Sequence, residues 1–444
     1  MHPFELNFPN TFHYGTLDEI DYAARRKGLD IPFSRDTAAL AVKPKINTRA
    51  GIIYPENSVF VLSMDGFDAD KSGAPSELTR RRYLRFARSG AGLILSEAIA
   101  VCADGRASDR QLMITHENIG AFHEMISEMK KITAAPIIAQ LTHSGRFSHS
   151  GACAYPIAAT RDKIIEAAFP FPDDIQPVSD EYLDLLPEKY LAAAKLLISA
   201  GFDGVDIKAC HQNLPGELLS AYMREGKYGG NFENRSRLLL DIARLIADNT
   251  EKEIILSSSL GICDMIPYPY GFGMNETSDL PDFSEANRIV NELYSVGVTS
   301  ISVTMGITCF NAHVSRPYNK GEKLPPEHPL VGVNRLIHGA EAIQKANPNV
   351  AVISSGYSYL REFAPYAASG ALSRGYSTGV GFGRMAFAYD GFANDFISGN
   401  INKNKVCISC SKCAEIARAG GASGCPIRDQ EIYLPLYRSL CMKK

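Results

Sequence analysis

The chain carries almost no excess charge, has no long uncharged apolar run and contains no internal repeat. Its 46 Lys and Arg against 49 Asp and Glu give a net charge of −3, so the chain has no overall basic field to attract nucleic acids or anionic lipids. No apolar run approaches the ~18 residues of a membrane span. The first residues, MHPFELNFPNTFHYG, lack the basic and apolar regions of a signal peptide. These absences predict a cytoplasmic protein without a nucleic-acid or membrane partner.

What the chain does have is the composition of a globular protein with a substantial core. Hydrophobic residues make up 45% and charged residues 21% of its 444 positions, enough for one large domain with additions, or for two or three smaller ones. Six of the ten cysteines stand singly, at positions 102, 153, 210, 263, 309 and 441. Isolated cysteines are usual in a reducing cytoplasm and support the same compartment.

The other four cysteines form the most informative pattern, near the end of the sequence. They are Cys407, Cys410, Cys413 and Cys425, spaced C-x2-C-x2-C-x11-C and followed by Pro426. Four thiolates suit either a tetrahedral zinc ion or a [4Fe–4S] cluster. Three closely spaced cysteines and a final Cys-Pro favour the cluster, because zinc sites more often consist of two separated CxxC pairs. A group of disulfides is disfavoured, since nothing in the sequence indicates secretion.

Short β-rich apolar runs recur along the chain, with helical patterns between them. Eight runs are continuous rather than alternating, which is typical of strands buried on both faces of a parallel sheet. They span 58–64, 92–98, 136–143, 204–210, 253–259, 300–305, 350–356 and 377–383. Eight β/α units predict an α/β fold, a (β/α)8 TIM barrel over residues 51–400, with an N-terminal extension (1–50) and a cysteine-cluster tail (401–444). A doubly wound sheet is the alternative, although no strand is followed by a GxGxxG turn.

In such a barrel the chemistry lies at the carboxyl ends of the strands. The third run ends in AQLTHSGRF, with Gln140, His143 and Arg146. The amide of Gln140 can donate and accept hydrogen bonds at the edge of a heterocycle. His143 and Arg146 could bind an anion or a carbonyl, and each is equally suited to a structural role. The fourth run ends in DIKACHQN, where Lys208 and His211 could polarise a carbonyl, bind a carboxylate or transfer a proton.

The seventh and eighth runs end in glycine-containing segments, ISSGYS and GFGRM, which contain Gly356, Gly383 and Arg384. Glycines leave backbone N–H groups accessible, and an arginine binds phosphate through two parallel hydrogen bonds. The loops after strands seven and eight are the usual phosphate site of TIM barrels. The sequence therefore predicts a cofactor phosphate at this place.

Several of these segments together resemble the old yellow enzyme superfamily of flavin-dependent barrels. They are AQLTHSGRF at 139–147, GFDGVDIKACH at 201–211, AGLILSEAIAV at 91–101, GFGRMAF at 381–387 and, most specific, YGGNFENRSR at 228–237. The cysteine run resembles the cluster motif of the superfamily's iron–sulfur branch, which includes 2,4-dienoyl-CoA reductase, 2-enoate reductases and trimethylamine dehydrogenase. Those relatives continue into a further FAD- or nucleotide-binding region, which is expected to be missing here.

The resemblance implies FMN as cofactor, a [4Fe–4S] cluster on the four tail cysteines, and hydride transfer from the flavin to an activated C=C bond. Gln140 would face the flavin pyrimidine, and Ala98 would offer backbone contacts beside the ring. The residues expected at the cofactor are Ser63, Met64, Ala98, Gln140, Arg146, Ser355, Gly356, Gly383 and Arg384. The residues expected in catalysis are Lys208 and His211, at the positions where the family anchors its substrate, together with His143.

Three positions depart from the family pattern. Asn213 stands where many members carry a tyrosine proton donor. An amide cannot donate a proton at neutral pH, so Lys208, His211, another tyrosine or water must take that role. Asp65 stands where Thr or Cys often tunes the flavin, and a carboxylate there would disfavour the anionic reduced form unless it is neutral or points away. Ser257 occupies the position where many relatives place an arginine.

The leading hypothesis is therefore an FMN and iron–sulfur oxidoreductase that reduces an enone or enoate, that is, an unsaturated carbonyl or carboxylate. The cationic Lys208 favours an anionic substrate. Electrons would come from a separate reductase or ferredoxin, or directly from NAD(P)H, and homo-oligomerisation is left open. One alternative is an amine or other C–N dehydrogenase that passes electrons out through the cluster, although Lys208 would repel a cationic amine. The other is a non-catalytic barrel subunit stabilised by zinc.

Overall fold

The computed structural model describes residues 12–149, 156–321 and 323–442, and its centre is a closed barrel of parallel strands. The strands follow the order β10-β3-β4-β5-β6-β7-β8-β9 around the barrel. Their bounds are β3 Val59–Val61, β4 Leu93–Ala100, β5 Ile137–Thr142, β6 Gly204–Ala209, β7 Ile255–Gly261, β8 Ser300–Thr304, β9 Ala351–Ser354 and β10 Gly379–Phe382. Each apolar run of the sequence overlaps one of these strands, so the predicted (β/α)8 barrel is confirmed.

The strands are buried on both faces, as their continuous apolar pattern predicted. Inside the barrel, Phe60, Leu95, Ile138 and Ile353 pack together. Ile46, which does not belong to a barrel strand, packs against them. Ile46 belongs to a short antiparallel hairpin formed by β1 Ile46–Asn47 and β2 Ile52–Ile53. The hairpin closes the amino end of the barrel, which leaves the carboxyl end for a site.

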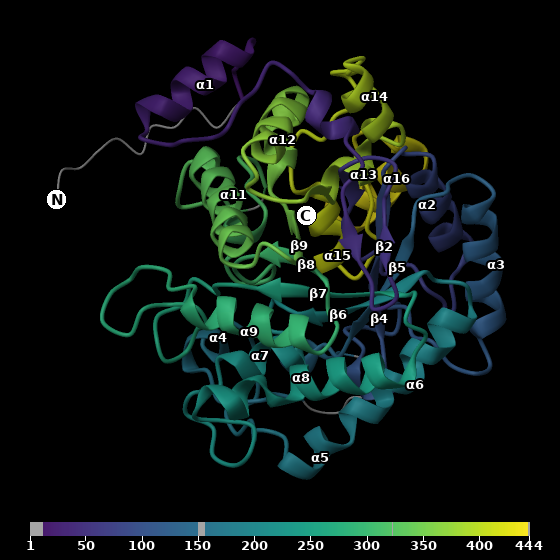
Figure 1. Cartoon of the computed structure of the whole chain (residues 1–444), viewed down its shortest axis with the longest axis vertical. Coiled ribbons are helices and arrows are strands. Elements are labelled where there is room, and N and C mark those ends of the chain that lie inside the picture. The colour runs from purple at the N-terminus through teal and green to yellow at the C-terminus, as the bar shows by residue number, and fades with distance from the viewer. Residues whose placement is uncertain (1–11, 150–155, 322, 443–444) are drawn as a thin grey trace.

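Helices cover the outside of the barrel (Figure 1). They are α2 Glu77–Ala87, α3 Ile119–Lys130, α6 Leu186–Ser199, α8 Phe232–Asn249, α9 Ser284–Ser295, α11 Pro329–Ala346, α12 Ala364–Ser373 and α14 Phe392–Ser398. Local sequence explains where they begin and end. Ser76 caps α2 by accepting a hydrogen bond from the backbone N–H of Thr79. Gly201 follows α6 with a φ of 102°, the left-handed conformation of the C-cap glycine that the sequence predicted.

Shorter elements occupy the loops, with η denoting a 3-10 helix. They are α1 Leu17–Arg26, η1 Ala38–Ala41, η2 Ala103–Gly105, η3 Gly145–Phe147, α4 Lys163–Glu166, α5 Asp180–Asp184, α7 Leu214–Leu219, α10 Ala312–Ser315, η4 Tyr357–Phe363 and α13 Arg384–Ala388. Six of them, η2, η3, α7, α10, η4 and α13, directly follow strands of the barrel at their carboxyl ends. Loops at this end are where a TIM barrel places its functional groups.

The tail after residue 400 contains two helices, α15 Lys412–Arg418 and α16 Gln430–Cys441 (Figure 1, yellow), and residues between them bond to the rest of the protein. The backbone N–H of Ser423 donates to the carbonyl of Gly66 at 2.6 Å. Arg81, on α2, makes two hydrogen bonds to Asp429, of 2.7 and 2.9 Å. These contacts fix the tail beside the end of β3.

The division into an extension (1–50), a barrel (51–400) and a tail (401–444) stays a prediction. Residues 1–11 of the extension and Cys153 lie outside the described residues. Within the described ranges, no helix has the length and apolar character needed to cross a bilayer.

Candidate functional site

A cavity of about 480 Å³ lies at the carboxyl ends of the strands. Its walls join the ends of β3, β5, β6, β9 and β10 to the tail. Of the residues expected at the site, the cavity is lined by Ser63, Met64, Gln140, Lys208, His211, Ser355, Gly356, Gly383 and Arg384. Among the described residues, Ala98, His143 and Arg146 are not part of its walls. The structure therefore brings most of the expected residues together and places three of them behind the cavity.

Gln140 lies in a hydrogen-bond network at the mouth of the barrel. Its Oε1 accepts from Oγ of Ser63 at 2.8 Å, and its Nε2 donates to Asp206 and to Ser259, both at 2.9 Å. Burial raises the pKa of Asp206, and hydrogen bonds from Gln140, Ser259 and Ser257 oppose that rise. Sequence reasoning missed Asp206, because a lone aspartate in an apolar run belongs to no motif. The network fixes the amide of Gln140 in the cavity wall and leaves one acceptor site on its Oε1.

Lys208, at the end of β6, faces Asp65, which follows β3. Nζ of Lys208 lies 3.9 Å from Oδ2 of Asp65, and both side chains line the cavity. Oδ1 of Asp65 accepts the backbone N–H of Ala98 at 3.2 Å, and the carbonyl of Ala98 accepts from Gln111 at 3.0 Å. The backbone groups of Ala98 are therefore bonded within the protein, and the charge of Asp65 is partly balanced by Lys208.

His211 has a left-handed backbone. Its φ is 57° and that of Gln212 is 59°, values that are rare outside glycine and that occur at functional sites. Nε2 of His211 lies 3.2 Å from Oγ1 of Thr304. Burial, followed by the charge of Lys208, lowers the pKa of His211 to about 3, so the imidazole is neutral at physiological pH. Gln212 donates to Oδ2 of Asp264 at 3.1 Å, which holds this strained segment in place.

His143 belongs to a separate network behind the cavity wall. Its Nε2 lies 2.8 Å from Oη of Tyr182, which donates to Asp104 at 2.7 Å, and the N–H of Gly145 donates to its Nδ1 at 3.1 Å. Burial lowers the pKa of His143 to about 4, against the opposing charge of Asp104. Ligand atoms of Cys102, Asp104 and His143 lie within 4.8 Å of one another. Because both ring nitrogens are engaged, the group fits a structural role better than a metal site.

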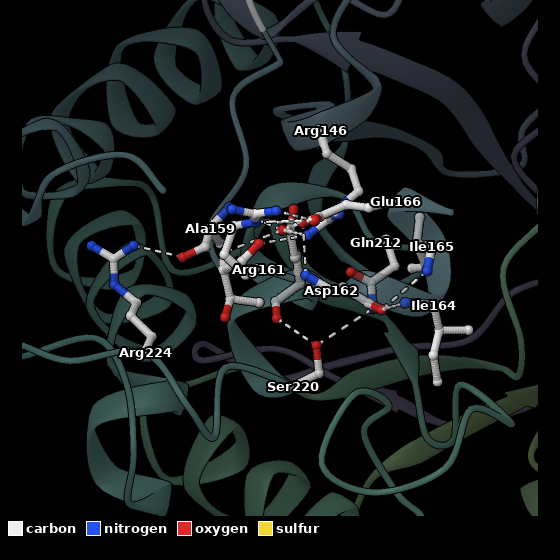
Figure 2. Close-up of polar contacts among 12 residues, drawn as sticks. Arg146, Ala159, Arg161, Asp162, Ile164, Ile165, Glu166, Gln212, Ser220 and Arg224 are labelled. Atoms are coloured by element: carbon white, nitrogen blue, oxygen red, sulfur yellow. Dashed lines mark hydrogen bonds and ion pairs between the residues drawn. The ribbon is translucent and has the colours of Figure 1, made fainter. Parts of the chain in front are cut away.

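Arg146 is buried in an ion pair with Glu217. Its Nε and Nη2 donate to Oε1 of Glu217 at 3.1 and 2.6 Å, and the backbone N–H groups of Ala159 and Thr160 donate to the same oxygen at 2.9 and 3.3 Å. Figure 2 shows Arg146 directed into this cluster of polar groups, beside Glu166. The pair joins the loop after β5 to α7, so the charge of Arg146 is satisfied within the protein.

Gly356 and Gly383, after β9 and β10, form a glycine cradle, that is, a space beside the backbone that larger side chains would fill. Gly356 has a φ of 99°, and a Cβ on Gly383 would come within 2.6 Å of Sδ of Met64. Nη2 of Arg384 donates to the carbonyl of Pro317 at 2.9 Å. Nη1 of Arg384 is buried and has no partner among the described residues. An unpaired guanidinium nitrogen beside glycine backbone suits a phosphate group, since a buried donor left unsatisfied is costly.

Two further arginines, Arg316 and Arg418, line the same cavity and were missed by sequence reasoning, because neither belongs to a recognised motif. Burial lowers the pKa of Arg316 to about 10; the charges of Arg384 and Arg418 add to this effect, and Cys413 opposes it. Nη1 of Arg316 and Oγ of Ser315 are buried without a partner in the described ranges. This corner of the cavity therefore holds positive charge and hydrogen-bond donors that an anion would satisfy.

The four tail cysteines line a second, small cavity next to the first, and Cys413 belongs to the walls of both. Ser409 and Ser411 have left-handed backbones, with φ of 50° and 62°, which turn the chain between the cysteines. The N–H of Ser409 donates to Sγ of Cys407 at 3.4 Å. Burial, and then the neighbouring Cys407, raises the pKa of Cys425 to about 12. Clustered, buried thiols keep their protons when no metal is bound. A metal centre would displace these protons, because cysteine binds metals as a thiolate.

A family model described as the NADH:flavin oxidoreductase / NADH oxidase family matches residues 56–361, most of the barrel. The chain belongs to this family. The NADH oxidase of Thermoanaerobacter brockii is 26% identical over 373 residues, which cover 82% of this chain and 52% of that protein. The NADPH dehydrogenase of Clostridium acetobutylicum is 28% identical over 204 residues, 45% of this chain and 58% of that protein.

A solved structure of the same barrel type is that of 2-naphthoyl-CoA reductase in complex with 2-naphthoyl-CoA. It superposes with a TM-score of 0.70 at 18% identity, over 88% of this chain and 57% of that one, a likeness that shows the fold. This chain thus spans little more than half the length of these three proteins. The old yellow enzyme superfamily predicted from the motifs is confirmed, and Asp65, Lys208 and Asn213 line the cavity.

Proposed function

We propose that the chain is an FMN-dependent oxidoreductase that reduces an activated C=C bond, with electrons passing through a [4Fe–4S] cluster on the tail cysteines. The observation that carries this proposal is the shared wall of the two cavities, since Arg384 and Cys413 line both. A flavin in the barrel and a cluster on the cysteines would then be neighbours, as electron transfer between them requires. Family membership supports the flavin chemistry.

The barrel cavity fits FMN in size and in chemistry. Its volume of about 480 Å³ lies within the ~300–1,000 Å³ of small-molecule and cofactor sites. The unpaired Nη1 of Arg384 and the glycine cradle at Gly356 and Gly383 would take the phosphate. The amide of Gln140 would face the pyrimidine edge, and Ser355 lies in the same wall. FMN, when bound, supplies hydride transfer to an electron-poor alkene.

Lys208 and His211 are proposed to hold the carbonyl or carboxylate of the substrate. The neutral imidazole of His211 acts as a hydrogen-bond partner rather than as a charged acid, and Lys208 supplies the positive charge. Together they would stabilise the enolate that develops when the β-carbon receives a hydride. The described part of the cavity wall contains no tyrosine. Lys208, oriented by Asp65 at 3.9 Å, is therefore the proposed proton donor to the α-carbon.

The order of the tail cysteines in the sequence supports a cluster over a single zinc ion. Three of them follow the pattern C-x2-C-x2-C, and the fourth, Cys425, is followed by Pro426. Closely spaced cysteines that end in Cys-Pro are typical of iron–sulfur ligation, whereas zinc sites more often consist of two separated CxxC pairs.

The proposed substrate is an unsaturated carbonyl or carboxylate, and the proposed electron source is NAD(P)H or a separate reductase or ferredoxin. The two sources differ in their need for the cluster. If NAD(P)H reduces FMN directly, reduction by NAD(P)H in a stopped-flow instrument will be equally fast in a variant without cluster. If electrons enter through the tail, that variant will lose reduction by ferredoxin.

The test is the spectrum and content of the protein purified without oxygen. We expect flavin bands on a broad iron–sulfur absorption, with about one FMN and about four irons per chain, and reduction of an enone or enoate by the reduced protein. Cys410→Ser should lose iron and keep FMN, whereas Cys441→Ser, its control in the same tail, should keep both. A colourless protein that contains zinc would contradict the proposal.

A further inference from the structure

Three arginines lie at the boundary between the two cavities. Arg316, Arg384 and Arg418 all line the barrel cavity there, together with Cys413. Nη1 of both Arg316 and Arg384 is buried without a partner among the described residues, as is Oγ of Ser315.

Buried guanidinium groups normally have an anionic partner, because an uncompensated buried charge destabilises the fold. The proposed function supplies two anions at this boundary, the flavin phosphate on one side and the thiolate-bound cluster on the other. We propose, on the basis of that function, that Arg316 is a cation shared by the two cofactor sites. It would donate hydrogen bonds to the phosphate beside Arg384 and balance the negative charge of the cluster at Cys413.

The position of Arg316 in the chain fits this role. It comes from the loop after β8, so it belongs neither to the glycine cradle of β9 and β10 nor to the cysteine tail. Its neighbour Pro317 accepts a hydrogen bond from Arg384 at 2.9 Å, so the same loop also orients the other phosphate-directed arginine. The guanidinium lies 5.4 Å from the centre of the Tyr318 ring, which supports it from its own loop.

The experiment compares Arg316→Gln with Arg428→Gln in the full chain. Arg428 is a matched control, because it lines the small cysteine cavity, is not part of the described wall of the barrel cavity, and bonds the carbonyl of Val406 at 3.2 Å. Two quantities are measured: the dissociation constant of FMN, by fluorescence titration of flavin-free protein, and the reduction potential of the cluster, by redox titration followed by electron paramagnetic resonance.

For Arg316→Gln we expect the FMN dissociation constant to rise about ten-fold or more, as for the loss of one charge-assisted hydrogen bond. The cluster potential should fall as well, because removal of a nearby positive charge disfavours the reduced, more negative cluster. Arg428→Gln should change the potential alone. Arg316→Lys keeps the positive charge but lacks the planar guanidinium that donates two parallel hydrogen bonds. Compared with Arg316→Gln, it should restore the cluster potential more completely than the FMN affinity.

A change in only one of the two quantities in Arg316→Gln would overturn the shared role, and a change in neither would overturn any role at the cofactors. If the wild-type protein binds FMN and iron, and Arg316→Gln has the same FMN dissociation constant and cluster potential, this inference is refuted and the proposed function stands. A wild-type protein that takes up neither FMN nor iron would refute both. Circular dichroism of each variant shows whether the fold is kept.

Discussion

Replacing Arg146 by methionine should destabilise the protein without weakening its contact with the cofactor. The guanidinium makes two hydrogen bonds to Oε1 of Glu217, at 3.1 and 2.6 Å, and both side chains are fully buried. Removal of one partner from a buried ion pair costs about 3–5 kcal/mol, because the other charge is left uncompensated. Glu217 would keep the N–H groups of Ala159 and Thr160, which places the expected loss at ~3 kcal/mol.

Arg161→Met is the matched control for this change. Arg161 lies in the same loop and bonds Glu166 at 2.8 to 3.1 Å, but 49% of its side chain is exposed. Exposed ion pairs contribute only ~0–1 kcal/mol, so the control should be nearly neutral. The double variant Arg146→Met/Glu217→Gln should recover part of the lost stability, because it removes the uncompensated charge as well.

The assay is urea unfolding followed by far-UV circular dichroism, at one fixed concentration of FMN, since a bound ligand adds stability by mass action. The FMN dissociation constant of Arg146→Met is measured in parallel and should stay within about two-fold of the wild type, a difference well below 1 kcal/mol. If Arg146→Met lowers the free energy of unfolding no more than Arg161→Met does, the buried pair with Glu217 does not have the stabilising role described. If the variant is stable but binds FMN poorly, Arg146 contacts the cofactor, as the sequence alone predicted.

Two further predictions concern Lys208 and the buried Asp264. Lys208→Met should lower the turnover of an enone or enoate by about 10²–10⁴-fold if Lys208 is the proton donor, whereas flavin reduction, measured by stopped flow, should be little changed; an unaltered turnover excludes that role. Burial raises the pKa of Asp264 to about 7, above the ~3.9 of an unfolded chain. The stability that the protonated Asp264 contributes is therefore fully present below pH ~3.9 and is lost as the pH rises from there through 7. The free energy of unfolding of Asp264→Asn should therefore fall less between pH 6 and 8 than that of the wild type; equal slopes in urea titrations at the two pH values would count against a buried, titrating Asp264.

The barrel could be predicted from the sequence because its signal is carried within each strand. A continuous apolar run needs no knowledge of its neighbours to indicate a strand buried on both faces. The positions of Gln140, Lys208 and Arg384 follow from the same logic, since each lies at or directly after the carboxyl end of such a run. Their presence in one cavity wall is a consequence of parallel strands that close into a barrel.

The direction of a side chain beyond a strand end could not be predicted in this way. His143 and Arg146 follow β5 by one and four residues, but Gly145 turns the backbone there with a φ of 60°, and η3 begins at that residue. The turn directs Arg146 toward Glu217, whereas His143, which precedes the turn, accepts the N–H of Gly145 at Nδ1 and faces Tyr182 with Nε2. Alternation along the strand no longer applies after such a turn, so neither partner can be read from the local sequence.

Arg316 was not predicted from the sequence, for a different reason. It lies in a loop after β8 whose sequence matches no phosphate motif, and its significance depends on Arg384 and Cys413, which are 68 and 97 positions further along the chain. Contacts over such sequence separations depend on the closed topology of the barrel and on the return of the tail to its carboxyl end. Local patterns carry no information about either.

The three positions that differ from the expected family pattern have partners in the structure. Ser257 donates to the buried carboxylate of Asp206 at 2.8 Å, and Asn213 accepts from Thr142 at 2.6 Å. These two bonds satisfy buried polar groups, which every folded barrel requires whether or not it is catalytic. Asp65 differs, because it lies 3.9 Å from Lys208 and both side chains line the cavity. A charged pair in the cavity wall acts on a bound molecule as well as on the fold, so the Lys208–Asp65 pair is the element of the site where a difference in chemistry or substrate is expected to lie.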